Sequence, residues 1–180
     1  MEMEQLDRQV RTVVARLDAA IRTYFEVKGY SGEVKPHPPA SEQDIRRYEH
    51  FLGLRLPNTY RSFLRQHDGY DWLAIFGHIL PISELMPGGR AYERIVEWKR
   101  DNAKYGGGEV LDAVVIAELE EPNNYVYLDP NKVLTADEFV VVESTPEGSA
   151  ENAGLIAYFE GNITHCETVM ERMNIGQRPQ

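Results

Sequence analysis

The sequence lacks the cysteine pairs and the closely spaced histidines from which disulfides and zinc sites are built. Its 180 residues include one cysteine, Cys166, and five histidines. A single cysteine cannot form an internal disulfide, which favours a reducing compartment such as the cytoplasm. The histidines never stand at His-x-x-x-His spacing and there is no cysteine pair. The sequence therefore predicts no metal site and no cofactor, and Cys166 is expected to be a small buried side chain.

Long apolar runs are also missing. No stretch approaches the ~20 apolar residues that a membrane helix needs. The first residues, Met-Glu-Met-Glu-Gln-Leu-Asp-Arg, lack the basic start and apolar core of a signal peptide. We expect a cytoplasmic protein that has no contact with membranes.

Basic residues are scarce in one part of the chain. Residues 106–171 hold 14 acids and one lysine, Lys132, whereas residues 1–105 are almost balanced and the whole chain has a net charge of −10. Nucleic-acid binding needs clustered lysine and arginine, so that class of function is disfavoured. Opposed potentials steer encounters between proteins, which favours a basic protein partner. A solvated acidic face with an interface elsewhere stays open as the alternative.

The acids expected to contact that partner lie at predicted strand ends and loops, where binding residues collect on a rigid scaffold. They are Glu118, Glu120, Glu121, Asp129, Asp137, Glu138, Glu143 and Glu147.

Combinations of residues that catalyse reactions are missing as well. His165 and Cys166 are adjacent, so their side chains diverge on a helix and cannot pair as nucleophile and base. Asp68, beside Gly69, is expected to accept hydrogen bonds from backbone N–H groups in a turn. Residues 106–108 are three glycines without the lysine of a phosphate-binding loop, and are predicted to be a connection. We expect a protein that is not an enzyme.

What the sequence does contain is a pair of short helices between Pro39 and Gly69. Ser41 can cap the first helix, and Gly53 can end it in a left-handed conformation. Pro57 can start the second helix, where its missing N–H costs nothing. Apolar residues at helical spacing predict an apolar stripe on each helix, and we expect the stripe of the second helix to be buried under the sheet. The stripes are Ile45, Tyr48, Phe51 and Leu52 on the first helix, and Tyr60, Phe63 and Leu64 on the second.

The same stretch resembles a known family. Its second helix and the following turn match the pattern Leu-Pro-x-x-Tyr-x-x-Phe-Leu-x-x-x-Asn/Asp-Gly through Leu56, Pro57, Tyr60, Phe63, Leu64, Asp68 and Gly69, with Glu49 and Gly53 upstream. This pattern is similar to that of the SUKH superfamily (Smi/Knr-like), and residues 125–130 more weakly resemble the central strand of that family. The family includes bacterial immunity proteins against secreted toxins and eukaryotic regulators of cell-wall synthesis.

The rest of the chain predicts a single α+β domain. Apolar residues at helical spacing predict a long helix over residues 4–26, which either packs on the domain or binds a partner. Further expectations are strands over 70–76, 113–118, 123–128 and 139–143, helices over 91–105, 150–159 and 164–173, and a turn at 129–132. We expect a small, mostly antiparallel sheet packed with helices, in a SUKH-like domain of residues 39–180 that follows an N-terminal helix and linker of residues 1–38.

The resemblance implies an immunity protein that binds and neutralises a toxin domain. A nuclease domain would suit the acidic half of the chain, because nucleases tend to be basic. The alternative is an intracellular regulatory or scaffold protein of the Smi/Knr type. In both cases the activity would be protein binding.

Overall fold

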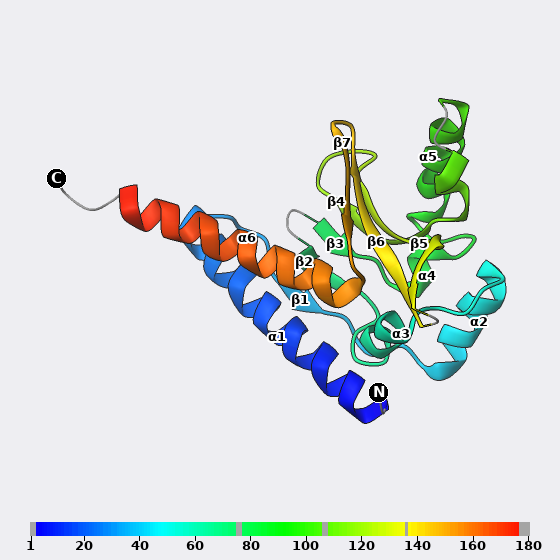
Figure 1. Ribbon diagram of the computed structural model, residues 1–180, viewed down its shortest axis with the longest axis horizontal. Coiled ribbons are helices and arrows are strands. Elements are labelled where there is room, and N and C mark those ends of the chain that lie inside the picture. Colours follow the sequence, from blue (N-terminus) through cyan, green and yellow to red (C-terminus); the bar gives the residue numbers. More distant parts are fainter. Residues whose placement is uncertain (1–2, 75–76, 106–107, 136, 177–180) are drawn as a thin grey trace.

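The computed structural model describes residues 3–74, 77–105, 108–135 and 137–176, and over these residues the fold is α+β (Figure 1). The predicted fold class is therefore confirmed. The helices are α1 (Met3–Lys28), α2 (Glu42–Leu52), α3 (Asn58–Leu64), α4 (Ile82–Leu85), α5 (Tyr92–Lys104) and α6 (Leu155–Gly176), with a 3₁₀ helix η1 (Gly108–Asp112). The strands are β1 (Lys35–Pro36), β2 (Tyr70–Ala74), β3 (Gly77–Ile79), β4 (Val114–Leu119), β5 (Tyr125–Thr135), β6 (Glu138–Thr145) and β7 (Gly148–Asn152).

The strands form one antiparallel sheet in which each strand pairs with the next in sequence, from β1 to β7. Helices α1 and α6 lie side by side on one side of this sheet, and α5 lies on the other (Figure 1). Alternation along β5 turns Tyr125 and Tyr127 toward α5, where Trp98 packs with its ring centroid 4.9 and 5.9 Å from theirs. The opposite face of β5 carries Val126 and Leu128, which are fully buried.

The predicted helix pair is present and is fixed by the residues that punctuate it. The Ser41 hydroxyl accepts a hydrogen bond from the Asp44 N–H at 3.1 Å, and Gly53 ends α2 with a φ of 68°. Asp68 accepts a hydrogen bond from the Ile82 N–H at 2.8 Å, as expected of a backbone-binding turn residue. The α3 stripe of Tyr60, Phe63 and Leu64 is completely buried, whereas Phe51 of the α2 stripe is 41% exposed.

Helix α1 packs against α3 and α6. Its buried face consists of Val10, Val13, Val14, Leu17, Ile21, Tyr24 and Phe25. Asp7 fixes its start by accepting hydrogen bonds from the Ser62 hydroxyl at 2.6 Å and from Arg65 at 2.8 Å. A boundary between two units at residue 38 stays a prediction. None of the described helices has an apolar stretch long enough to cross a membrane.

The turn predicted at residues 129–132 is wrong, because β5 continues through it. Asp129 pairs with Val140 and Val133 pairs with Phe139, so the additional residues form a bulge. The Asp129 carboxylate accepts a hydrogen bond from the Asn131 N–H at 3.0 Å, which is a local turn contact. That contact kinks the strand but does not reverse it.

The helix predicted over residues 150–159 is also wrong in its first part. Residues 148–152 form β7, where Glu151 pairs with Val142 of β6, and the helix begins only at Leu155. Pairing with a neighbouring strand has outweighed the local helical pattern. The strand predicted over 70–76 ends at Ala74 in the described part, and Ile75, Phe76 and the glycines at 106 and 107 lie outside the described residues.

Candidate functional site

Four of the predicted partner-binding acids line one hollow of about 480 Å³, here called the acidic hollow. Its lining consists of Leu119, Glu120, Glu121, Asn124, Glu143, Thr145 and Glu147. These residues come from the end of β4, the β4–β5 turn, the end of β6 and the β6–β7 turn. These acids, which the sequence analysis expected at separate strand ends and loops, therefore lie together, because the two turns meet although they are distant in sequence.

The hairpin geometry explains why these two turns meet. Asn123 adopts a left-handed conformation with a φ of 65°, which asparagine tolerates better than most residues, and so reverses the chain after β4. The Leu119 N–H then donates to the Asn124 carbonyl at 2.9 Å to close the turn. Tyr125 pairs with Ser144, which sets the β4–β5 turn beside the β6–β7 turn.

The carboxylates of the acidic hollow have no cationic side chain bonded to them within the described residues. The ion pairs found between residues 108 and 171 involve other acids, namely Glu118, Asp129, Glu151 and Glu160. Burial raises the pKa of the Glu143 carboxyl, and the charge of His165 on α6 opposes this shift. The hollow thus combines like charges with partial desolvation, which favours a cationic occupant.

Asn124 is the buried polar residue of the acidic hollow. The residue is only 5% exposed, and its Oδ1 has no hydrogen-bond partner in the part of the chain that the structure describes. Buried polar atoms in native proteins are nearly always paired, so such an acceptor calls for an explanation. The sequence analysis missed this residue, because only the pairing of β4 with β5 shows that it is buried.

The other four predicted acids lie elsewhere. Glu118 binds Arg94 of α5 at 2.6 Å, and Asp137 is exposed in the β5–β6 turn. Asp129 is only 2% exposed, because its carboxylate is turned inward at the bulge of β5. A buried carboxylate cannot meet a partner directly, so Asp129 is an internal residue in the free protein.

Glu138 also has an internal role. Its carboxylate accepts a hydrogen bond from the Thr59 hydroxyl of α3 at 2.5 Å. Burial raises the pKa of Glu138, while backbone N–H groups, including that of Leu155 at the start of α6, oppose the shift. A carboxylate placed at the N-terminus of a helix stabilises the helix, so Glu138 links β6 to α3 and α6.

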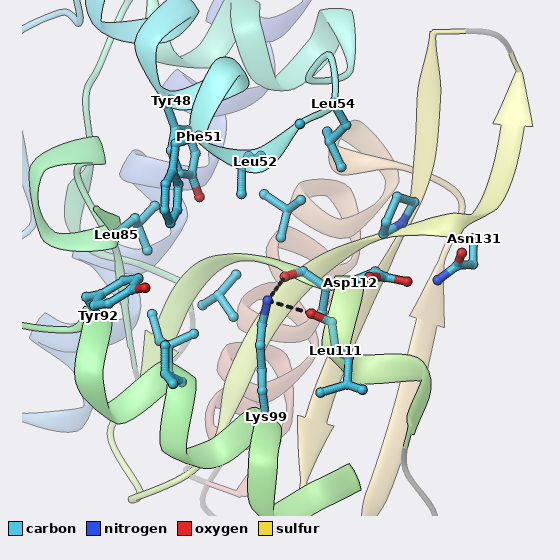
Figure 2. A pocket seen from close by; sticks show the side chains of 17 residues that line it. Tyr48, Phe51, Leu52, Leu54, Leu85, Tyr92, Lys99, Leu111, Asp112 and Asn131 are labelled. Atoms are coloured by element: carbon cyan, nitrogen blue, oxygen red, sulfur yellow. Dashed lines mark hydrogen bonds between the residues drawn. The ribbon is translucent and has the colours of Figure 1, made fainter. Parts of the chain in front are cut away.

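A second concave feature, here called the apolar groove, lies between α2, α5, η1 and the strands β4 and β5, with a volume of about 460 Å³ (Figure 2). Phe51 and Leu111 border it and remain 41% and 51% exposed. Lys99 extends into it from α5, and its Nζ donates to the carbonyls of Leu111 at 3.1 Å and Ala113 at 2.6 Å (Figure 2). Burial lowers the pKa of Lys99.

The width of the apolar stripe on α2, which includes Phe51, is the sequence signal that could have indicated the apolar groove. The periodic stripe of α2 contains more apolar residues than its packing on the core uses. The surplus residue forms the rim of the groove instead.

The described residues hold no group of three or more histidine, cysteine, aspartate or glutamate side chains that could bind a metal ion. Cys166 is fully buried, and burial raises its pKa to about 11. The thiol is therefore neutral near pH 7, and a neutral thiol is a poor nucleophile. The acidic hollow has the charge that is needed to bind a cation. The apolar groove has the surface that is needed to bind an apolar group.

Comparison with known proteins gives one match to a family. The model of the SMI1 / KNR4 family (SUKH-1) matches residues 39–158, which is more than half of the chain. The match runs from the helix pair into α6, and it includes the residues that line both concave features. No curated protein sequence matches the chain at a significant level.

Proposed function

The chain belongs to the SMI1/KNR4 (SUKH-1) family, and we propose that it is a cytoplasmic immunity protein that binds and neutralises a cognate secreted toxin domain. It would act by covering the toxin, without catalysing a reaction of its own. The toxin domain would present a basic surface, as the surface of a nuclease does. The acids would dock that surface or imitate a nucleic-acid substrate.

The acidic hollow is the observation that carries this proposal. Four carboxylates line this hollow, from β6 and the two turns, and the ion pairs found among the described residues of this acidic half involve other acids. Like charges held together raise the free energy of the unbound protein, and a basic partner would relieve that repulsion. Exposed charges of this kind act mainly by speeding the encounter, which suits a protein that must reach a toxin before the toxin reaches its target.

The apolar groove supports a second candidate function, a regulatory or scaffold protein of the Smi/Knr type. Interfaces of lasting complexes are more apolar than those of transient ones. Phe51 and Leu111, exposed on the rim of the groove, would suit such an interface. This candidate predicts that substitutions in the groove, and not in the acidic hollow, abolish partner binding.

Growth of bacteria that co-express this chain with its toxin domain, to be sought among the products of neighbouring genes, tests the proposal. The wild-type chain should restore growth, and the triple variant E120K/E121K/E147K should not. The matched control is E26K/E33K/E93K, which changes the net charge equally at three exposed acids outside the hollow. Full protection by the E120K/E121K/E147K variant would contradict the proposed docking surface. Loss of protection on Phe51→Ser alone would favour the groove.

A further inference from the structure

We propose that the acidic hollow receives one arginine side chain of the partner, with its guanidinium held between the Asn124 amide oxygen and the surrounding carboxylates. This inference rests on the proposed function and specifies the contact at its docking surface. It assigns Asn124 a binding role that the acids alone would not indicate.

Asn124 provides the observation that is independent of charge. Its Oδ1 is buried and unpartnered among the described residues, although the side chain lines the hollow. A buried acceptor without a donor costs free energy in the unbound protein. A donor brought by a ligand removes that cost, so this position favours a ligand that carries N–H groups.

The carboxylates require that this ligand be a cation. Glu120 and Glu121 approach from the β4–β5 turn, and Glu143 and Glu147 from the other side, at β6 and the β6–β7 turn. Glu143 is half-buried, so its carboxylate is partly desolvated and would gain from a cationic partner. The acids of the hollow do not form a group that could bind a metal ion within the described residues, so the cation should be an organic one.

The distribution of the acceptors distinguishes arginine from lysine. The guanidinium group has five N–H donors in a planar fork, whereas an ammonium group has three donors on one atom. Acceptors that lie on two turns and on a buried amide can be reached together by the fork. Leu119 supplies an apolar wall against which the methylene groups of the arginine can pack.

Titration of the ¹⁵N-labelled protein with N-acetyl-arginine amide, followed by NMR, tests this inference. We expect saturable shifts of the Asn124 and Thr145 resonances with a Kd of ~1–10 mM, because a single side chain brings little binding energy. N-acetyl-citrulline amide has nearly the same shape without the charge and should not saturate. N-acetyl-lysine amide should bind at least ~10-fold more weakly. Equal binding of citrulline or of lysine would overturn the assignment to arginine.

The variant Asn124→Leu tests the role of the amide, with Asn131→Leu as the control at an exposed asparagine outside the hollow. Asn124→Leu should weaken binding of N-acetyl-arginine amide ~10-fold, while Asn131→Leu should leave it unchanged. Unaltered binding by Asn124→Leu would remove Asn124 from the site. If this variant does not fold, the comparison of arginine with citrulline and lysine on the wild-type protein still decides the proposal.

These results are separable from those on the proposed function. Slower toxin association by E120K/E121K/E147K, together with no arginine binding by the wild type, would overturn the arginine site alone. Saturable arginine binding together with full protection by that triple variant would overturn the docking surface alone.

Discussion

Replacing Leu64 with alanine should remove a large part of the stability of this chain. Leu64 is completely buried, and so are Tyr60 and Phe63 on the same face of α3. The Ala40 N–H donates to the Leu64 carbonyl at 2.9 Å, which fixes the backbone and limits its movement into the space left behind. Truncation of such a leucine costs ~2–5 kcal/mol, and we expect the upper half of that range because the site cannot collapse.

Urea unfolding monitored by circular dichroism measures this effect. With a slope of ~2 kcal/mol per M, a loss of ~3.5–5 kcal/mol moves the midpoint down by ~1.8–2.5 M. Leu111→Ala is the control, because Leu111 is 51% exposed and its truncation should change stability by less than ~0.5 kcal/mol. An unchanged midpoint for Leu64→Ala, or equal shifts for the two variants, would refute the reasoning about the α3 stripe.

Four further predictions concern an ion pair, two pH dependences and the groove. Glu49→Gln should cost ~1–3 kcal/mol in urea unfolding, because the Arg61 side chain, only 11% exposed, keeps Glu42 but loses one of its two carboxylate partners; an unchanged midpoint would contradict this. Burial raises the pKa of Glu143, so protonation of this carboxyl favours the folded protein as the pH falls from 7 toward 4.5, while the lowered pKa of His67 has the opposite effect. Between pH 7 and pH 4.5 the Tm of Glu143→Gln should therefore change less favourably than that of the wild type, and the same slope in both proteins would argue against this contribution. Below pH 3.8 the Tm should fall, because hydrogen bonds outweigh the opposing effect of burial and lower the pKa of Asp7. Phe51→Ser should leave toxin association unchanged in surface plasmon resonance, and slower association would place the contact in the groove.

The parts of the fold that could be predicted from sequence are those fixed by neighbouring residues. Ser41 and Gly53 bound α2 through contacts within a few positions, so their chemistry can be read directly. Strand β7 could not be predicted in this way, because its residues become a strand by pairing with β6. Residues 129–132 have the composition of a turn, and only the pairing of Asp129 with Val140 shows that the chain continues as a strand.

The candidate site, too, could be predicted from sequence only where local chemistry decides it. That Glu120 and Glu147 lie in turns follows from local sequence, and the structure places both in the acidic hollow. The ion pair between Glu118 and Arg94 could not be predicted from local sequence, because the two residues meet only through the packing of α5 beside β4. The burial of Asn124 likewise depends on strands around it. Charge pattern therefore indicates the kind of surface, and tertiary packing decides which acids are free to bind.

The rate of association with the toxin domain, measured against ionic strength, tests the central claim most directly. For the wild-type chain the rate should fall steeply between 0.1 and 1 M salt, because the screening length shrinks from ~10 Å to ~3 Å. E120K/E121K/E147K should associate at least ~10-fold more slowly at low salt and show a flatter dependence, while E26K/E33K/E93K should keep more of the wild-type rate and slope. Identical salt dependence for the wild type and the E120K/E121K/E147K variant would contradict a docking surface at the acidic hollow.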